Sequence, residues 1–156
     1  MLGRMFNREV INLGFSGNGK MEPEVAALVA ELDPAVFVLD CLPNMNDKEI
    51  NERAEACVKT IRAAHAATPI LLVEDRNYSD NFLNPGRRAR NETNHAAMRE
   101  VYAKMQRDKV PGLYYLKADL LVGTDGEGLI DGSHPTDLGF MRQATEFQKV
   151  LRKILK

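Results

Sequence analysis

Cysteine is scarce in this sequence, and its scarcity excludes several kinds of site. Among 156 residues there are two cysteines, Cys41 and Cys57. Their separation matches neither a zinc motif nor a redox pair of the Cys-x-x-Cys type. We therefore expect two free thiols that pack as small apolar side chains, and no structural metal site.

A strong charge bias and long apolar runs are also lacking. The formal net charge is -1, which favours neither nucleic acid nor an anionic membrane as a partner. No apolar run is long enough to span a bilayer, and residues 1–8 lack the apolar core of a signal peptide. These features predict a cytoplasmic protein with one domain over residues 1–156 and no membrane span.

Short apolar runs alternate with segments of helical periodicity. The runs have the length of buried strands, and the longer segments carry apolar residues every three or four positions. The predicted strands lie at 10–13, 36–39, 70–73 and 113–116, and the predicted helices at 22–32, 48–66, 87–107 and 137–155. This order predicts an α/β fold in which helices cover both faces of a parallel sheet.

Parallel sheets bind their ligands at the carboxyl ends of their strands. In this sequence the segments that follow the predicted strands are rich in glycine and polar residues. They lie at 14–20, 40–45, 74–76 and 123–135. We therefore expect these four segments to meet at one edge of the sheet and to contain the functional residues.

The spacing of Asp131 and His134 is typical of a carboxylate that orients a general base. An acceptor on one ring nitrogen fixes the tautomer, and the other nitrogen is then free to take a proton. The intervening Gly132 and Ser133, with Pro135, are equally common in ordinary turns that lead into a helix. Both interpretations remain open from the spacing alone.

The segment from Gly14 to Lys20 also has two interpretations. Gly14, four residues, and then Gly19-Lys20 match most of a nucleotide-binding phosphate loop, and Asp40 ends an apolar strand as a magnesium-binding acid would. However, Met21 replaces the hydroxyl residue that ligates the metal. The other interpretation is a glycine turn that presents backbone N–H groups to an anion or an oxyanion.

Three motifs in order resemble the SGNH (GDSL-like) hydrolase family, in particular bacterial members described as lipase or acylhydrolase. They are Asn-Leu-Gly-Phe-Ser-Gly at 12–17, Leu-Pro-Asn-Met at 42–45, and Asp131 with His134. The resemblance implies a three-layer, flavodoxin-like fold. It also implies hydrolysis of acyl or acetyl esters of small molecules or carbohydrates by a Ser-His-Asp triad, with neither a metal nor an organic cofactor.

The resemblance also assigns residues to roles. Gly17 corresponds to the glycine whose N–H serves the oxyanion hole, and Asn44 to the asparagine whose side-chain amide joins it. Asp131 and His134 correspond to the acid and base of the triad.

The family's nucleophilic serine lies in an earlier block, and no such block precedes Gly14 in this sequence. The resemblance therefore predicts a sheet that lacks its first strand. The edge left unpaired would be covered by a second copy of the chain in a homodimer. Ser16 is the alternative nucleophile in this chain. Its other interpretation is a turn hydroxyl that caps the following helix. If no nucleophile is supplied, the chain is a non-catalytic relative that binds a carbohydrate or a partner.

Two further groups have competing interpretations. Cys41 follows a predicted strand and would be a thiol nucleophile for His134, although a buried apolar role is the more usual one. Asp125 and Glu127 lie among glycines and would bind a cation or sugar hydroxyls, or simply belong to a solvated loop.

Overall fold

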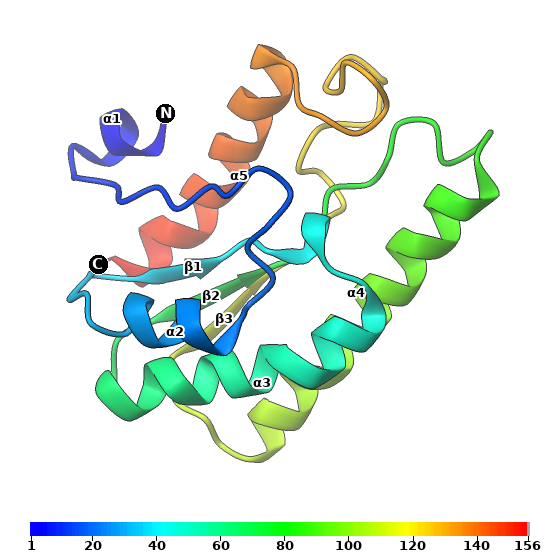
Figure 1. Cartoon of the computed structure of the whole chain (residues 1–156). Helices are drawn as coiled ribbons and strands as arrows, with labels where there is room; N and C mark the ends of the chain where they lie inside the picture. The colour runs from blue at the N-terminus through cyan, green and yellow to red at the C-terminus, as the bar shows by residue number, and fades with distance from the viewer. Residues whose placement is uncertain (156) are drawn as a thin grey trace.

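A three-stranded parallel sheet forms the centre of the computed structural model, which describes residues 1–155 (Figure 1). The strands β1 (Phe37–Leu39), β2 (Ile70–Val73) and β3 (Leu113–Leu116) lie in the order β1-β2-β3. Leu39 pairs with Leu72, and Val73 with Leu116. All three strands therefore end at the same edge, and three of the four predicted strands are confirmed.

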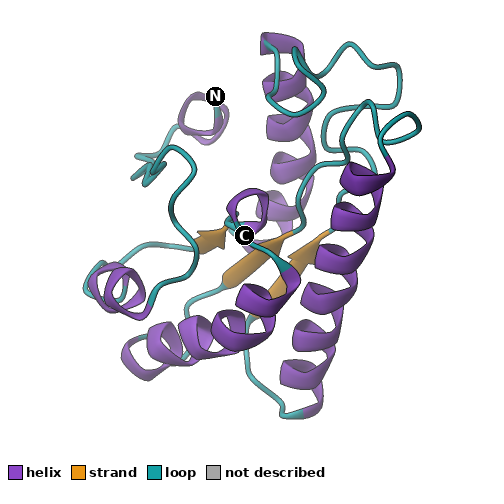
Figure 2. Cartoon of the chain, turned by 45° about the vertical axis from the view of Figure 1, so that its right-hand side comes forward, coloured by secondary structure: helices purple, strands orange, loops and turns teal. Residues whose placement is uncertain are grey.

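Helices cover both faces of the sheet, as predicted (Figures 1 and 2). One face carries α2 (Pro23–Val29), α3 (Asp47–Ala64) and α4 (Pro85–Arg107), and the other carries α1 (Leu2–Phe6) and α5 (Asp137–Ile154). Within the described residues, no helix has the length and apolar character needed to cross a membrane.

The alternation of side chains along each strand divides the core in two. Ile70 and Leu72 pack with α3 and α4, whereas Leu71 and Val73 pack with Phe147 and Leu151 of α5. All four β2 side chains are fully buried, which explains why the strand reads as a continuous apolar run. Burial of each such side chain contributes about 1.5–3 kcal/mol.

The fourth predicted strand, at residues 10–13, is absent. This segment is part of the irregular connection between α1 and α2 (Figure 1), and Val10, Ile11 and Leu13 are 55%, 56% and 46% exposed. A strand needs a neighbour that completes its backbone hydrogen bonds. No residue among 1–155 pairs with this segment, so its apolar pattern does not produce a strand.

The loop that carries Asp131 and His134 packs closely against the first turn of α5. The Thr136 side chain caps α5 by accepting from the Gly139 N–H, and the Thr136 N–H donates to the Gly128 carbonyl at 3.0 Å. A Cβ built on Gly139 would lie only 2.0 Å from that carbonyl oxygen. Glycine at this position therefore allows the contact that anchors the loop.

We expect Gly139→Ala to destabilise the protein by about 1–3 kcal/mol or more, because the added methyl group overlaps the Gly128 backbone. Gly86→Ala is the matched control, since Gly86 lies in the first turn of α4 with only the Asn84 side chain nearby, at 3.4 Å. That variant should be neutral or more stable by about 0.4–1 kcal/mol. Chemical denaturation measures both. Equal stability of the two variants would contradict the proposed close contact.

Candidate functional site

A pocket of about 540 Å³ opens at the carboxyl ends of β1 and β2. It contains four of the residues that the sequence assigned to the site, Ser16, Gly17, Asn44 and His134, although they come from opposite ends of the chain. Its lining residues are Ser16, Gly17, Asp40, Pro43, Asn44, Arg76, Ser133, His134, Pro135, Phe140 and Gln143. The fifth assigned residue, Asp131, lies outside the lining and contacts His134 directly.

Asp131 holds His134 through hydrogen bonds within the loop. One carboxylate oxygen lies 2.7 Å from His134 Nδ1, and the other accepts from the backbone N–H groups of Ser133 (2.9 Å) and His134 (2.7 Å). The His134 N–H, its side chain and the Ser133 N–H together hold the pKa of Asp131 well below its usual range. Asp131 is therefore ionised and accepts a hydrogen bond from Nδ1. The lone pair of the neutral ring then lies on Nε2. Within residues 1–155, Nε2 makes no hydrogen bond.

The turn at residues 16–19 is joined to the segment after β1. Gly17 has a φ of 86°, in the left-handed region that glycine adopts without strain. The Asn44 side-chain amide donates to the Asn18 carbonyl at 2.6 Å, which leaves its second N–H for another acceptor. Asn44 ends the short 3-10 helix η1 (Leu42–Asn44), whose first residue Leu42 and following residue Met45 are fully buried. The two predicted oxyanion donors therefore occupy neighbouring, anchored positions.

Ser16 lies in the same pocket as His134, but no hydrogen bond joins the two side chains in the described structure. Its φ of 48° is left-handed, a conformation that costs free energy for a residue other than glycine. The alternative prediction, that Ser16 caps the following helix, is wrong. The helix α2 begins at Pro23 after Glu22, and no side chain caps it.

Two charged residues also line the pocket, and the family resemblance assigned neither of them a role in ester hydrolysis. Asp40 directly follows β1, and Arg76 lies just beyond β2. Asp40 is an exposed residue at the pocket, but protein atoms crowd its carboxyl group and reduce its solvation. This loss of solvation, followed by repulsion from Asp75 and opposed by Arg76, raises the pKa of Asp40 to about 6. The signal in the sequence is a charged residue immediately after a buried strand.

The glycine segment does not have the geometry of a phosphate loop. In such a loop the lysine lies at the start of the helix. Here Lys20 precedes the first residue of α2, Pro23, by three positions, and its ammonium lies 3.4 Å from Glu49. Met21 between them is buried.

The competing candidates have structural roles. Burial raises the pKa of the Cys41 thiol to about 11 and that of Cys57 to about 12, so neither forms a thiolate at neutral pH. Both cysteines are free, as predicted.

Asp125 forms two 2.6 Å hydrogen bonds with Arg142, which lower the pKa of Asp125 to about 2. Over residues 1–155, no cluster of three or more acidic, cysteine or histidine side chains is arranged to hold a metal ion.

Comparison with known proteins is consistent with this arrangement. The model of the GDSL-like lipase/acylhydrolase family matches residues 1–152. The chain belongs to the GDSL-like lipase/acylhydrolase family. No curated protein matches it.

Two solved structures resemble this GDSL-like family member. A protein from Bacteroides ovatus ATCC 8483, described as a GDSL-like lipase, is 40% identical with a TM-score of 0.95. The match covers 99% of this chain and 46% of that protein. The salicylyl-acyltransferase SsfX3 from a tetracycline biosynthetic pathway is 16% identical with a TM-score of 0.77, and the match covers 98% of this chain and 47% of SsfX3. At that identity SsfX3 shows the fold alone, and the chain spans less than half the length of either structure.

We expect Asp40→Asn to stabilise this GDSL-like chain at pH 7.5 and to have a much smaller effect at pH 4. A carboxyl whose folded pKa is raised binds its proton more tightly in the folded state, so the wild type loses stability as pH rises from about 4 to about 6. Asparagine stays neutral and avoids this loss. Thermal unfolding at the two pH values measures the effect, with Asp33→Asn on the loop before β1 as the control. A lower stability of Asp40→Asn at pH 7.5 would contradict the expectation.

Proposed function

We propose that the pocket is the acyl-transfer site of an esterase or acylhydrolase of the GDSL-like family. The observation that carries this proposal is the content of the pocket. A histidine bonded to a carboxylate lies in the same cavity as a serine, a glycine turn and an asparagine amide. These are the parts that acyl transfer requires: a base, a nucleophile and donors for an oxyanion.

In the proposed reaction, the nucleophilic hydroxyl gives its proton to His134 Nε2 while its oxygen attacks the ester carbonyl carbon. Asp131, ionised and bonded to Nδ1, stabilises the imidazolium that forms. The tetrahedral intermediate then collapses, and the imidazolium gives its proton to the departing alcohol. Water, activated by the same imidazole, cleaves the acyl-enzyme and releases the carboxylic acid.

The developing oxyanion would be held by the Gly17 N–H and by the free N–H of the Asn44 amide. The turn that carries Gly17 is fixed by the bond from Asn44 to Asn18, so both donors are placed before the substrate arrives. Preorganised donors of this kind are usually the largest single contribution to acyl transfer, at about 3–4 kcal/mol for one donor.

Two serine hydroxyls line the pocket, and that of Ser133 already accepts a hydrogen bond from Arg76, so we propose the other, Ser16, as the nucleophile to be tested. The hydrogen bond to His134 that a proton transfer needs would form on substrate binding. In substrate-free enzymes, catalytic hydrogen bonds often form only in the complex.

We propose an ester of a polar small molecule or a carbohydrate as the substrate. The wall of the pocket combines the charged side chain of Asp40 with the amide of Gln143 and the half-exposed ring of Phe140. Polar groups beside an aromatic ring suit an alcohol that carries several hydroxyls.

A second candidate function is binding without turnover. The observation that favours it is the absence, among the described residues, of a hydrogen bond between Ser16 and His134. In that case the pocket would hold a carbohydrate or an ester, and the pair of Asp131 and His134 would serve only as hydrogen-bonding groups.

A fluorophosphonate probe distinguishes these two functions, because it forms a covalent bond only with an activated serine. We expect labelling of Ser16 in the wild type and its loss in Ser16→Ala and His134→Ala. Intact-protein and peptide mass spectrometry measure both the extent and the site of labelling.

Ser79→Ala is the matched control, since Ser79 lies outside the pocket. It should label like the wild type. A folded wild-type protein that remains unlabelled would reject Ser16 as the nucleophile and support the binding function.

We also propose that a second copy of the chain covers the outer edge of β1. Among the described residues this strand pairs with β2 on one side only, and its own Val38 is 37% exposed. An unpaired strand edge beside apolar side chains is prone to pair with another chain.

Light scattering over a series of concentrations tests this dimer. We expect the mass to rise towards twice that of the monomer, and Val38→Lys to weaken the association because a lysine on an edge strand opposes pairing. Thr145→Lys on the exposed side of α5 is the control. A monomer at every concentration would reject the dimer.

A further inference from the structure

Arg76 connects the core of the protein to the loop that carries His134. It lies just beyond β2, and only 7% of its surface is exposed. Its guanidinium forms an ion pair with Asp75 and two hydrogen bonds to Ser133, one from Nε to the carbonyl at 2.7 Å and one from Nη2 to the hydroxyl at 2.6 Å. Ser133 is the residue immediately before His134.

The hydrogen bonds between Asp131 and His134 cannot by themselves place the imidazole in the pocket. Both residues belong to the same loop, so their bonds fix the ring relative to the loop and not relative to Gly17 and Asn44. Contacts between the loop and the rest of the protein must therefore set the position of His134. The contact of Gly128 with Thr136 and Gly139 anchors the end of the loop on α5, and the contacts to residues 131–133 come from Arg76, from Arg87 and from the backbone of Ser79.

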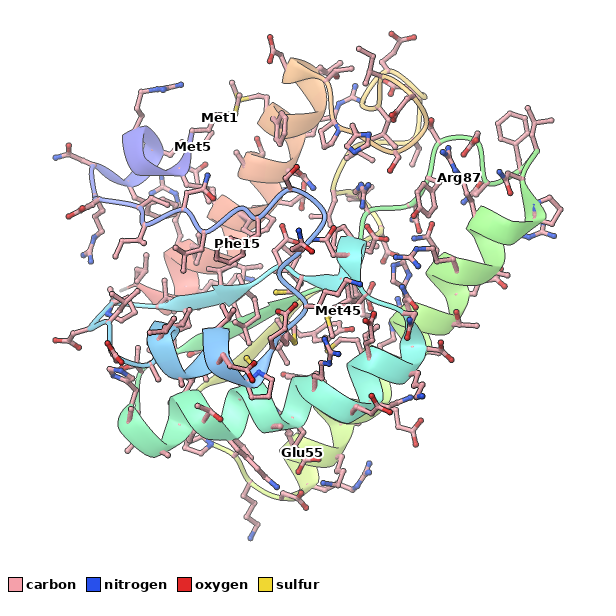
Figure 3. The ribbon with its side chains drawn as sticks, in the orientation of Figure 1. Met1, Met5, Phe15, Met45, Glu55 and Arg87 are labelled. Carbon is pink, nitrogen blue, oxygen red and sulfur yellow. The ribbon has the colours of Figure 1, made fainter. Side chains whose placement is uncertain are left out.

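Arg87 makes the weaker of the two arginine contacts. It lies at the start of α4 beside the loop, in the right-hand part of Figure 3, and donates to the Asp131 carbonyl at 3.2 Å while pairing with Asp80 at 2.8 Å. About a third of its side chain is exposed. The Arg76 contacts are shorter, bidentate and buried, and such charge-assisted bonds are the stronger and more directional ones.

A network of buried polar groups holds Arg76 itself in place. Asn91 donates to the Arg76 carbonyl at 3.2 Å, and His95 Nε2 lies 2.7 Å from the Asp75 carbonyl. Both side chains belong to α4 and are almost fully buried. A buried ion pair is seldom more stabilising than apolar residues of similar size, and its best-supported role is to specify position.

We infer that Arg76 is a positioning residue, whose forked contact with Ser133 fixes the 131–134 loop so that His134 stays in the wall of the pocket that contains Gly17 and Asn44. This inference rests on the proposed function for its catalytic meaning. The position of His134 is nevertheless measurable without any turnover.

The experiment compares Arg76→Ala with Arg99→Ala. Arg99 makes a similar bidentate contact with the buried Glu74, at 2.5 and 3.0 Å. Glu74 directly precedes Asp75, the carboxylate that pairs with Arg76. Although burial alone would raise the pKa of Glu74, Arg99, the Ala118 N–H and the Tyr115 hydroxyl hold it below its usual range. Loss of Arg99 therefore also disturbs a buried pair at the end of β2, but Arg99 does not contact the 131–134 loop.

NMR of the His134 imidazole in the full chain is the measurement. We expect one sharp set of signals in the wild type and in Arg99→Ala, and broadened or multiple signals in Arg76→Ala. Millimolar guanidinium should restore the single set in Arg76→Ala, because it refills the vacated site, and should not change Arg99→Ala.

Two more conservative variants test the same contact in case Arg76→Ala does not fold. Arg76→Lys keeps the positive charge beside Asp75 but cannot make both hydrogen bonds to Ser133. It should therefore also broaden the His134 signals. Ser133→Ala removes only the hydroxyl contact and should have a smaller effect in the same direction.

Ester turnover gives an independent readout. If the chain hydrolyses p-nitrophenyl acetate, Arg76→Lys should lower kcat by tenfold or more with little change in KM, since displacement of a base by about 1 Å can cost ~100-fold. Sharp, unchanged signals in the Arg76 variants, or equal broadening in Arg99→Ala, would overturn the inference. Absence of turnover together with the expected NMR changes would reject the proposed function and leave the positioning role supported.

Discussion

The parallel alignment of β1, β2 and β3 is the constraint on which the rest of the structure depends. Each strand ends at the same edge, and the register is fixed because alternate β2 side chains fill two different apolar clusters. A shift of one residue would exchange the side chains of the two clusters. Since the register is fixed, Asp40 and Arg76 leave the core beside each other and face the same pocket.

This alignment also explains why charged residues are buried at the sheet edge. Glu74 and Asp75 follow β2 directly and are fully buried, so each needs a cationic partner to offset its loss of solvation. Arg99 of α4 forms an ion pair with Glu74, and Arg76 forms one with its sequence neighbour Asp75. Because Arg76 also bonds to Ser133, the group that compensates a buried carboxylate links the sheet to the pocket.

Local patterns in the sequence predict the parts of the structure that depend on neighbouring residues. The strands at 70–73 and 113–116 are confirmed to the residue, and α5 to within one residue, because length and periodicity decide them. Asp131 and His134 are three residues apart, and this spacing allows the contact that the structure shows. The sequence did not predict the link between Arg76 and Ser133, which joins residues 57 positions apart. It wrongly predicted a strand at 10–13, since pairing depends on a neighbour that local pattern does not reveal.

The two sides of the pocket are stabilised in different ways, and this difference bears on how the site is prepared. On one side, Leu42 and Met45 are buried in the core on either side of Asn44, so folding places its amide, and that amide holds the exposed turn of Gly17 by its hydrogen bond to the Asn18 carbonyl. On the other side, Asp131 and His134 are exposed and belong to a loop without apolar anchors of its own at those positions. Of the proposed oxyanion donors, the Asn44 amide is therefore positioned by hydrophobic burial, whereas Gly17 and the proposed base His134 are positioned by polar and charged contacts. A site built in this way retains the Asn44 amide when the 131–134 loop moves, whereas His134 is in place only while its polar contacts persist.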